Sequence, residues 1–583
     1  MMIKISNKIM MLFSLLLLAT ATFAASEAEY KKLVKSWTLN PDGSQEFNYK
    51  MELAIYTHTA MNSTYGESFI VYNPDYQTLT INESYTKQKD GNIVKTPDNA
   101  FVEVLPRNAA NAPAYNQLKE MVVVHTGLEL GATIYLDYTI KTKAGYLPQI
   151  DINEDLQQSS PVKSCEISIS IPESKTLSYK IANRNEKVSQ SSSNGQKVYK
   201  WRFSNIPAVS RMIDSYHMDR QCIAANTYPS SKEMAETIYS QFEQKKTMPL
   251  VTMAEAITEK AANDKDKVVA IYQYIKGNYE MIPLSINETG YKIRPAEEVI
   301  NSAYGTPAEL ANIMQGLLRA ANIKANTLAC FPDKSAEGYG LNKSIIFVET
   351  EANGNKYILA TDDATTAALK TFRQYYSALN LENGTISEAK PMKLDLTFDA
   401  NISADKDGKF NANVKASVPE YYLDIEGKKI KSFAGNDIKS CKTNGDFAEM
   451  EYSKNISTEK AGNYIILSLP DCGTGNYLSM LALQGGKSNK LITLPGMINE
   501  SYSYSVSSPA NATVSSKSAN KEITNSVGSV KINIKAENGK VNVSRSITIS
   551  NPKIEAKDYP KFTELIRAWE NQNYNSVIFE VKE

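Results

Sequence analysis

Residues 304–325 have the layout of a catalytic helix that lacks its nucleophile. They read YGTPAELANIMQGLLRAANIKA, in which apolar residues recur along one helical stripe. A cysteine at the start of such a helix is activated because the helix dipole stabilises its thiolate. Here the start of the helix carries Thr306 and Pro307 instead. The segment therefore predicts a helix whose start carries no thiol.

The residues at this start are those that cap a helix. Thr306 is suited to the N-cap, Pro307 to the first helical position, and Glu309 to the third, which together form a capping box. Such a cap stabilises a helix by about 1 kcal/mol. This pattern indicates that the start of the helix has a structural role and not a catalytic one.

The supply of a general base is also limited. The chain has three histidines, His58, His125 and His217, and none of them follows residue 217. A Cys–His pair therefore cannot form within the helical region, where Cys330 is the single cysteine. No CxxC motif or Cys/His cluster is present, so we expect no metal and no cofactor.

The five cysteines leave two interpretations open. They lie at wide, irregular spacing: Cys165, Cys222, Cys330, Cys441 and Cys472. Cys441 and Cys472 are the nearest pair along the chain and could form a disulfide in an exported protein. Alternatively, most of the five are small buried hydrophobic residues.

Hydrophobic periodicity predicts a multidomain, β-rich protein. Short alternating segments fill the region up to about residue 215, which favours a β-sandwich. A helical period followed by a hairpin predicts an α+β domain over 225–375. Alternation returns over 390–583 and predicts a C-terminal β domain with a closing helix. Serines 189–193 with Asn194-Gly195 are interpreted as one loose turn.

The first 24 residues are interpreted as a signal peptide. Lys4 and Lys8 precede an apolar run from 9 to 18, and small residues follow it up to Ala24. The run is shorter than the roughly 20 residues that a membrane span requires. We therefore expect a soluble, exported protein, periplasmic or extracellular. The expected segments are the signal peptide (1–24), the β-sandwich (25–215), the α+β domain (225–375) and the C-terminal β domain (390–583).

Composition excludes one class of partner. Lys plus Arg and Asp plus Glu both total 64 in a chain of 583 residues. No net field therefore attracts nucleic acid. No later segment is long and apolar enough for a transmembrane span.

Three segments together carry a resemblance to a known family. They are IYQYIKGNY (271–279), RPAEEVINSAYG (294–305) and LANIMQGLLRAANIKA (310–325). They resemble the transglutaminase-like domains of exported bacterial proteins, which belong to the papain-like superfamily. The flanking regions resemble the β domains of unknown function that accompany such domains. The resemblance implies a papain-like α+β fold in the middle of the chain.

The resemblance also implies where a catalytic triad would lie. Active members read YGDCKDKA at the helix start, followed by a His in NHV and an Asp in YWLDPT. Aligned from Tyr304-Gly305, these positions fall on Pro307, Lys343 and Ala360. The triad positions are therefore degenerate, and we expect no Cys–His–Asp catalysis.

Three functional readings follow from this alignment. The first is a non-catalytic binding or assembly module of the cell envelope, with Tyr304, Thr306, Lys343 and Asp362 lining the cleft. The second is a residual peptidase or amidase that uses Asp362, Asp363 or Lys343 instead. The third is a spacer between working β domains. The partner would be an envelope protein, a peptide or a polysaccharide, and tyrosine-rich segments such as YNPDYQT (72–78) and RQYYSALN (373–380) could stack on sugar rings.

Overall fold

The described part of the chain forms two compact units. The computed structural model describes residues 26–209, 220–243, 247–372, 375–389, 393–423, 425–435, 437–443, 447–472, 491–494 and 496–582. The first unit ends at Thr227 and the second continues from Tyr228. The predicted signal peptide and His217 lie outside the described residues. No described helix is long and apolar enough to cross a membrane.

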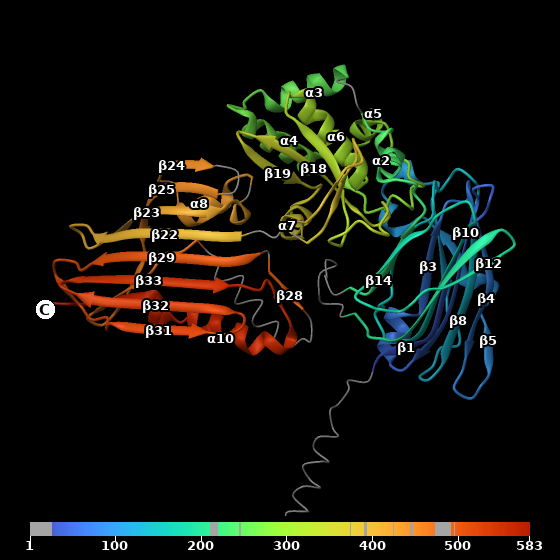
Figure 1. Cartoon of the computed structure of the whole chain (residues 1–583), viewed down its shortest axis with the longest axis horizontal. Helices are drawn as coiled ribbons and strands as arrows, with labels where there is room; N and C mark the ends of the chain where they lie inside the picture. Colours follow the sequence, from blue (N-terminus) through green and yellow to red (C-terminus); the bar gives the residue numbers. More distant parts are fainter. Residues whose placement is uncertain are drawn as a thin grey trace, which may run out of the picture. The chain divides into compact units, whose positions relative to one another are not determined.

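The first unit is a β domain (Figure 1). Its strands are β1 (Ala28–Leu39), β2 (Gln45–Ile55), β3 (Glu67–Tyr72), β4 (Gln77–Lys87), β5 (Ile93–Lys95), β6 (Phe101–Val104), β7 (Lys119–Val124), β8 (Thr133–Thr142), β9 (Asp151–Asp155), β10 (Val162–Pro172), β11 (Ser178–Ala182), β12 (Ser189–Ser193), β13 (Gln196–Ile206) and β14 (Cys222–Asn226). Eight of them form one sheet in the order β12-β13-β10-β1-β2-β8-β4-β5, and β11-β14-β9 and β3-β7-β6 form smaller sheets. Most neighbours are antiparallel, but β1 and β10 pair in parallel.

The core of this unit lies between the large sheet and the two smaller ones. Ile167 and Trp201 of the large sheet are fully buried in one cluster with Val123 of β7 and Ile223 of β14. Side chains from all three sheets therefore share one interior, as the alternation along each strand requires. The predicted N-terminal β domain is confirmed.

One local prediction in this unit is wrong. Serines 189–193 form strand β12, which pairs antiparallel with β13 from Ser189↔Lys200 to Ser193↔Gln196. Only Asn194 and Gly195 make the turn, with φ of 52° and 72°. Two consecutive left-handed residues are typical of a two-residue hairpin turn. The serine run was misjudged because its residues are exposed and carry no apolar alternation.

The central region of the second unit is α+β. Its elements are α2 (Ser231–Tyr239), α3 (Met248–Thr258), α4 (Asp264–Asn278), β15 (Glu280–Met281), α5 (Ala296–Ser302), β16 (Tyr304–Gly305), α6 (Pro307–Ala320), β17 (Ala325–Cys330), β18 (Ile345–Ala352), β19 (Asn355–Leu359), α7 (Asp363–Phe372), β20 (Ala378–Asn380) and β21 (Ile386–Ser387). The sheet order is β19-β18-β17-β20-β21, with antiparallel neighbours throughout. Helix α6 packs against α3, α4, β17 and β18, and its residues from Ala308 to Leu318 are all buried. The predicted α+β architecture is confirmed in this region.

The C-terminal region is again built from strands. They are β22 (Lys393–Ala404), β23 (Phe410–Pro419), β24 (Ile438–Thr443), β25 (Phe447–Ile456), β26 (Thr458–Ala461), β27 (Tyr464–Ser468), β28 (Ile492–Thr493), β29 (Met497–Ser507), β30 (Ala512–Val514), β31 (Ala519–Thr524), β32 (Gly528–Glu537), β33 (Lys540–Ile549), β34 (Lys553–Ile554) and β35 (Ser576–Val581), with helices α8 (Lys428–Ala434), α10 (Tyr559–Trp569) and α11 (Gln572–Asn575). The large sheet has the order β24-β25-β23-β22-β29-β33-β32-β31 (Figure 1). The predicted helix is α10, although strand β35 follows it.

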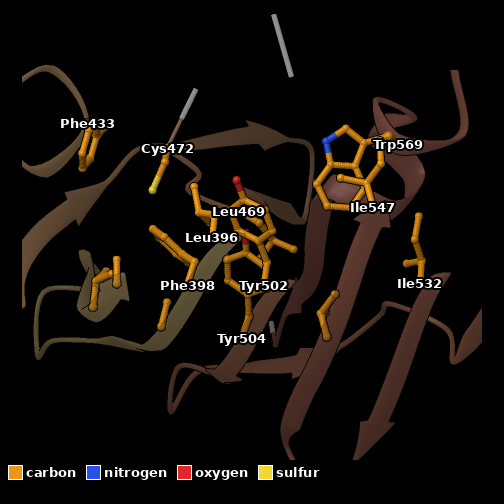
Figure 2. Packing of buried hydrophobic residues seen from close by; sticks show 14 of the residues in the cluster. Leu396, Phe398, Phe433, Leu469, Cys472, Tyr502, Tyr504, Ile532, Ile547 and Trp569 are labelled. Carbon is orange, nitrogen blue, oxygen red and sulfur yellow. The ribbon is translucent and has the colours of Figure 1, made fainter. Parts of the chain in front are cut away.

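The two faces of this sheet differ strictly. Along β22, Leu394, Leu396, Phe398, Ala400 and Ile402 are buried, and the residues between them are exposed. The buried face meets α10, which contributes Phe562, Leu565, Ile566 and Trp569. Figure 2 shows Trp569 near Tyr502, with Phe398 and Tyr504 beside it; the Tyr502 and Trp569 ring centroids are 5.6 Å apart. Among the described residues, no apolar layer covers the opposite face, whose β22 side chains are exposed.

Candidate functional site

The start of helix α6 is closed by its own residues. The backbone N–H of Thr306 donates to Oε2 of Glu309 at 3.0 Å, and the N–H of Glu309 donates to Oγ1 of Thr306 at 3.4 Å. With Pro307 as the first helical residue, this is the capping box expected from the sequence. The N–H groups of Thr306 and Glu309 are here satisfied by the helix itself.

An arginine holds the capping glutamate in place. Arg294 donates from its backbone N–H and from Nε to Oε1 of Glu309, at 3.0 and 3.2 Å, and from Nη2 to Oε2 at 3.1 Å. Nη2 also donates to the carbonyl oxygen of Tyr304 at 2.7 Å, and the guanidinium lies 4.8 Å from the Tyr304 ring centroid. Glu309 is only 1% exposed. This is a buried, bidentate ion pair, and it occupies the helix start.

The packing around Gly305 is close. A Cβ added to Gly305 would lie 2.9 Å from Cγ1 of Val299 and 3.2 Å from Oε2 of Glu309. A side chain at this position would therefore displace the Val299 side chain or the Glu309 carboxylate. The glycine is required for the approach of α5 to the capping box.

Lys343 lies in the turn before strand β18. Its φ is 58°, in the left-handed region that few residues other than glycine and asparagine adopt. Ser344 donates its N–H to the carbonyl oxygen of Leu341 across the turn, and the Lys343 side chain is exposed. At this position the chain presents an ammonium on a tight turn.

Ala360 is part of the core. It is 1% exposed and belongs to a cluster that includes Cys330 and Phe347. Its backbone N–H donates to Oγ1 of Thr366 at 3.0 Å, and that hydroxyl donates to the carbonyl oxygen of Asp362 at 2.8 Å. Ala360 and Asp362 are thus joined through the first turn of α7.

The carboxylates beside this turn have structural partners. Asp362 accepts from the N–H and the hydroxyl of Thr365, each at 2.7 Å, as a helix cap does. Asp363 accepts from Tyr272 at 3.1 Å and from Lys276 at 2.5 Å, and Lys276 lowers the pKa of Asp363. Burial raises the pKa of Tyr272. Asp363 therefore remains ionised and cannot act as a general acid near neutral pH.

The described histidines belong to the first unit, whereas Cys330 belongs to the second. Cys330 is fully buried on β17, and no disulfide joins any of the five cysteines, all of which are described. His125 belongs to the first unit, where its Nε2 lies 2.8 Å from Oγ of Ser68 and burial lowers its pKa to about 4. His58 is an exposed residue of the same unit. In the described ranges, no group of three or more His, Cys, Asp and Glu side chains could hold a metal ion.

The structure thus connects the predicted positions in two separate sets. Tyr304 and Thr306 share the network of Arg294 and Glu309, whereas Ala360 and Asp362 share the turn at Thr366. Arg294 was missed by sequence reasoning. Arg294 is visible in the sequence as the basic residue that begins RPAEEV. Nothing in the local pattern, however, pairs it with a glutamate 15 residues later.

Comparison with known families agrees with this architecture. Three family models match: the domain of unknown function DUF3857 over residues 41–210, the transglutaminase-like superfamily over 251–360, and the domain of unknown function DUF3858 over 475–579. A solved structure from Parabacteroides distasonis ATCC 8503, described as a "putative protease", is 35% identical, with a TM-score of 0.69. The match covers 95% of this chain and 99% of that chain. The chain belongs to the transglutaminase-like superfamily.

Two further comparisons give little additional information about this transglutaminase-like protein. A "putative cysteine protease" from Cytophaga hutchinsonii matches at 15% identity and a TM-score of 0.17, over 52% of this chain and 96% of that one. None of the curated proteins compared with the chain matches it. The family and its flanking domains are established, and the activity is a separate question.

Proposed function

We propose that this transglutaminase-like protein is non-catalytic and serves as a binding or assembly module of the cell envelope. The observation that carries the proposal is the start of α6, where Thr306, Glu309 and Arg294 satisfy one another. Pro307 stands at the aligned nucleophile position, with neither a nucleophilic side chain nor an N–H for an oxyanion hole. Lys343 and Ala360 stand at the aligned base and acid positions.

The exported location is part of the same proposal. Its support is the pattern of Lys4 and Lys8 before an apolar run that ends in small residues. Mature protein taken from the cell envelope should begin close to residue 25. N-terminal sequencing checks this, and an intact Met1 in the envelope fraction would contradict it. An envelope protein, a peptide or a polysaccharide remains the proposed class of partner.

A residual hydrolase is the second candidate, because the 35% identical relative is described as a "putative protease". A thiol mechanism would need Cys330, which is fully buried, and a base from outside the central region. A carboxylate mechanism would need Asp362 or Asp363, whose oxygens accept hydrogen bonds from Thr365, Tyr272 and Lys276. These contacts favour the non-catalytic proposal.

Two cysteine variants separate the candidates. Cys441 is exposed and would react with any thiol probe, so Cys441→Ser provides the background. In that background we expect no hydrolysis of peptide amides and no glutamine–lysine cross-linking, with or without Cys330→Ser. Turnover that Cys330→Ser abolishes and Cys441→Ser retains would establish the hydrolase instead.

Reversion of the aligned positions provides a second test. The triple variant Pro307→Cys, Lys343→His and Ala360→Asp, made in the Cys441→Ser background, should gain labelling at position 307 by a thiol-reactive probe. The Ala360→Asp single variant is the control for stability, since Ala360 is 1% exposed and a carboxylate there would be buried. Equal labelling without Pro307→Cys would mean that another thiol reacts.

A further inference from the structure

The exposed face of the C-terminal sheet contains a hollow lined by short polar side chains. It has a volume of about 480 Å³ and lies over four neighbouring strands, β22, β29, β33 and β32. Its polar lining residues are Asp399, Asn401, Ser503, Ser505, Asn533, Lys535, Asn542 and Ser544. Ala400, Tyr504 and Val543 also line it, but their side chains are buried, with exposures of 3%, 3% and 2%.

Strand register arranges these eight residues in two transverse rows. Cross-strand pairing joins Asp399, Ser503, Ser544 and Asn533 in one row, and Asn401, Ser505, Asn542 and Lys535 in the next. Strands in a sheet lie about 4.8 Å apart, and residues on one face repeat about every 6.7 Å. The rows therefore form a platform of about 14 Å by 7 Å, the scale of a short oligomer and not of a single ion.

The polar side chains of this hollow have no bonding partner among the described residues. None of the eight makes a side-chain hydrogen bond or an ion pair with another described residue. Elsewhere on the same face polar side chains pair: Asn499 donates to Asp395 at 3.0 Å, and Lys531 binds Glu522 at 2.9 Å. The eight lining side chains thus keep their hydrogen-bonding groups available within the described protein, as Thr397, Ser501 and Ser546 of the adjacent row also do.

The platform is also rigid. All four strands are interior to the sheet, so their backbone groups are bonded on both sides. Phe398, Tyr502 and Tyr504 pack beneath them in the core (Figure 2). Side chains held on such a scaffold lose little freedom when a ligand binds.

The chemistry of the lining selects the class of ligand. Amides and hydroxyls both donate and accept hydrogen bonds, as the hydroxyls of a sugar do. Asp399 and Lys535 balance in charge, which disfavours polyanions and polycations. No apolar side chain is presented, which disfavours lipids. An extended peptide needs a free sheet edge or side-chain pockets, and these interior strands have no free edge.

We infer that this hollow is a binding site for a neutral glycan segment, recognised by hydrogen bonds from the two polar rows. No aromatic ring is exposed in the hollow for sugar stacking, so a single site should bind in the millimolar range. The inference concerns the C-terminal domain and holds whether or not the central domain is catalytic.

Binding is tested on the whole protein with defined probes. Neutral tetrasaccharides (β-1,4-glucan, α-1,4-glucan, β-1,4-xylan, β-1,4-mannan and chitotetraose) are titrated calorimetrically, beside an anionic oligogalacturonide and an extended Ser/Gly-rich octapeptide. The triple variant Asn401→Ala, Asn533→Ala and Asn542→Ala should weaken binding of the best neutral glycan by about tenfold or more. Asn499→Ala, on β29 outside the hollow, should leave affinity within about twofold.

Each other outcome overturns the inference. No neutral tetrasaccharide binding at about 20 mM would remove the site, since millimolar affinity would then be excluded. Binding that the triple variant retains would place the glycan elsewhere. Tighter binding of the oligogalacturonide or the octapeptide, lost in the triple variant, would assign the hollow to another class of ligand. Asn542→Asp, which keeps the shape and replaces the donating amide group by an acceptor-only carboxylate oxygen, should also weaken binding, and it replaces the triple variant if that fails to fold.

Discussion

Polar side chains cluster in two regions of this protein. In one region they bond to one another, and in the other they have no partner among the described residues. At the start of α6, Thr306, Glu309 and Arg294 bind one another, and Glu309 is 1% exposed. In the hollow of the C-terminal sheet, residues such as Asn401 and Asn542 face solvent without a partner inside the described protein. The first region lies within the transglutaminase-like match over residues 251–360, and the second lies partly within the DUF3858 match over residues 475–579.

This difference indicates which of the two regions can bind a ligand. A polar group that is bonded inside the protein contributes to stability, and removing its partner leaves a desolvated group behind. A polar group that is held rigidly but unbonded contributes little to stability and can bind a ligand. Substitutions in the first region should therefore change folding, and substitutions in the hollow should change binding only.

The largest effect should come from the buried ion pair. Glu309→Ala leaves the Arg294 guanidinium without its carboxylate and should lower the unfolding free energy by about 3–5 kcal/mol. Denaturant titration of the purified protein measures it. Glu298→Ala, an exposed glutamate on α5, is the matched control, with an expected change within about 0.5 kcal/mol. A loss below about 1 kcal/mol for Glu309→Ala would break the comparison.

His125 sharpens the comparison because it is buried and only partly bonded. Its Nε2 meets Ser68, whereas its Nδ1 has no partner in the described structure. Burial lowers its pKa from 6.5 to about 4. Between those values the unfolded chain binds more protons, so stability should fall as the pH falls from about 6.5 to about 4.

This loss should total about 3 kcal/mol, since each pKa unit corresponds to about 1.4 kcal/mol. Unfolding titrations at pH 7 and pH 4 measure it as the difference between the protein and its His125→Gln variant. The exposed His58→Gln should keep the pH dependence of the parent. An unchanged pH dependence in His125→Gln would show that this imidazole does not titrate as a buried group.

A smaller effect is expected at the cap itself. Thr306→Ala removes the hydroxyl that accepts from Glu309 N–H but leaves the ion pair, so about 1 kcal/mol should be lost. Thr306→Ser retains the acceptor and should recover most of it. Thermal unfolding of the three proteins in parallel gives the comparison. If Thr306→Ala cost as much as Glu309→Ala, the cap and the ion pair would have to act as one unit.

The smallest effect should be on the stability of the hollow. Asn401→Ala, Asn533→Ala and Asn542→Ala should each change the unfolding free energy by about 0.5 kcal/mol or less, because no internal bond is lost. Asn499→Ala, which loses bonds to Asp395 and Thr548, should cost slightly more. A large loss of unfolding free energy in these three variants would mean that the side chains of the hollow stabilise the sheet.

Local features of the chain were predictable from its residues. The capping box needs only residues 306 and 309, three positions apart, and hairpins such as Asn353-Gly354 need only two adjacent residues. The run of serines at 189–193 was misjudged because β12 has no apolar alternation, and its strand character depends on pairing with β13. Prediction failed where the deciding partner was supplied from another strand.

What the sequence determined by itself is therefore short in range: the alternation of β22, the apolar stripe of α6, its cap, and the absence of histidine after residue 217. The tertiary structure alone decided that Arg294 reaches Glu309 and that Tyr375 and Tyr376, proposed to stack on sugars, are core residues with exposures of 4% and 1%. It also decided that Asp399, Ser503, Ser544 and Asn533 stand in one row. Helix caps and side-chain faces follow from backbone geometry over a few residues, whereas a row across four strands depends on register, which only the packed sheet specifies.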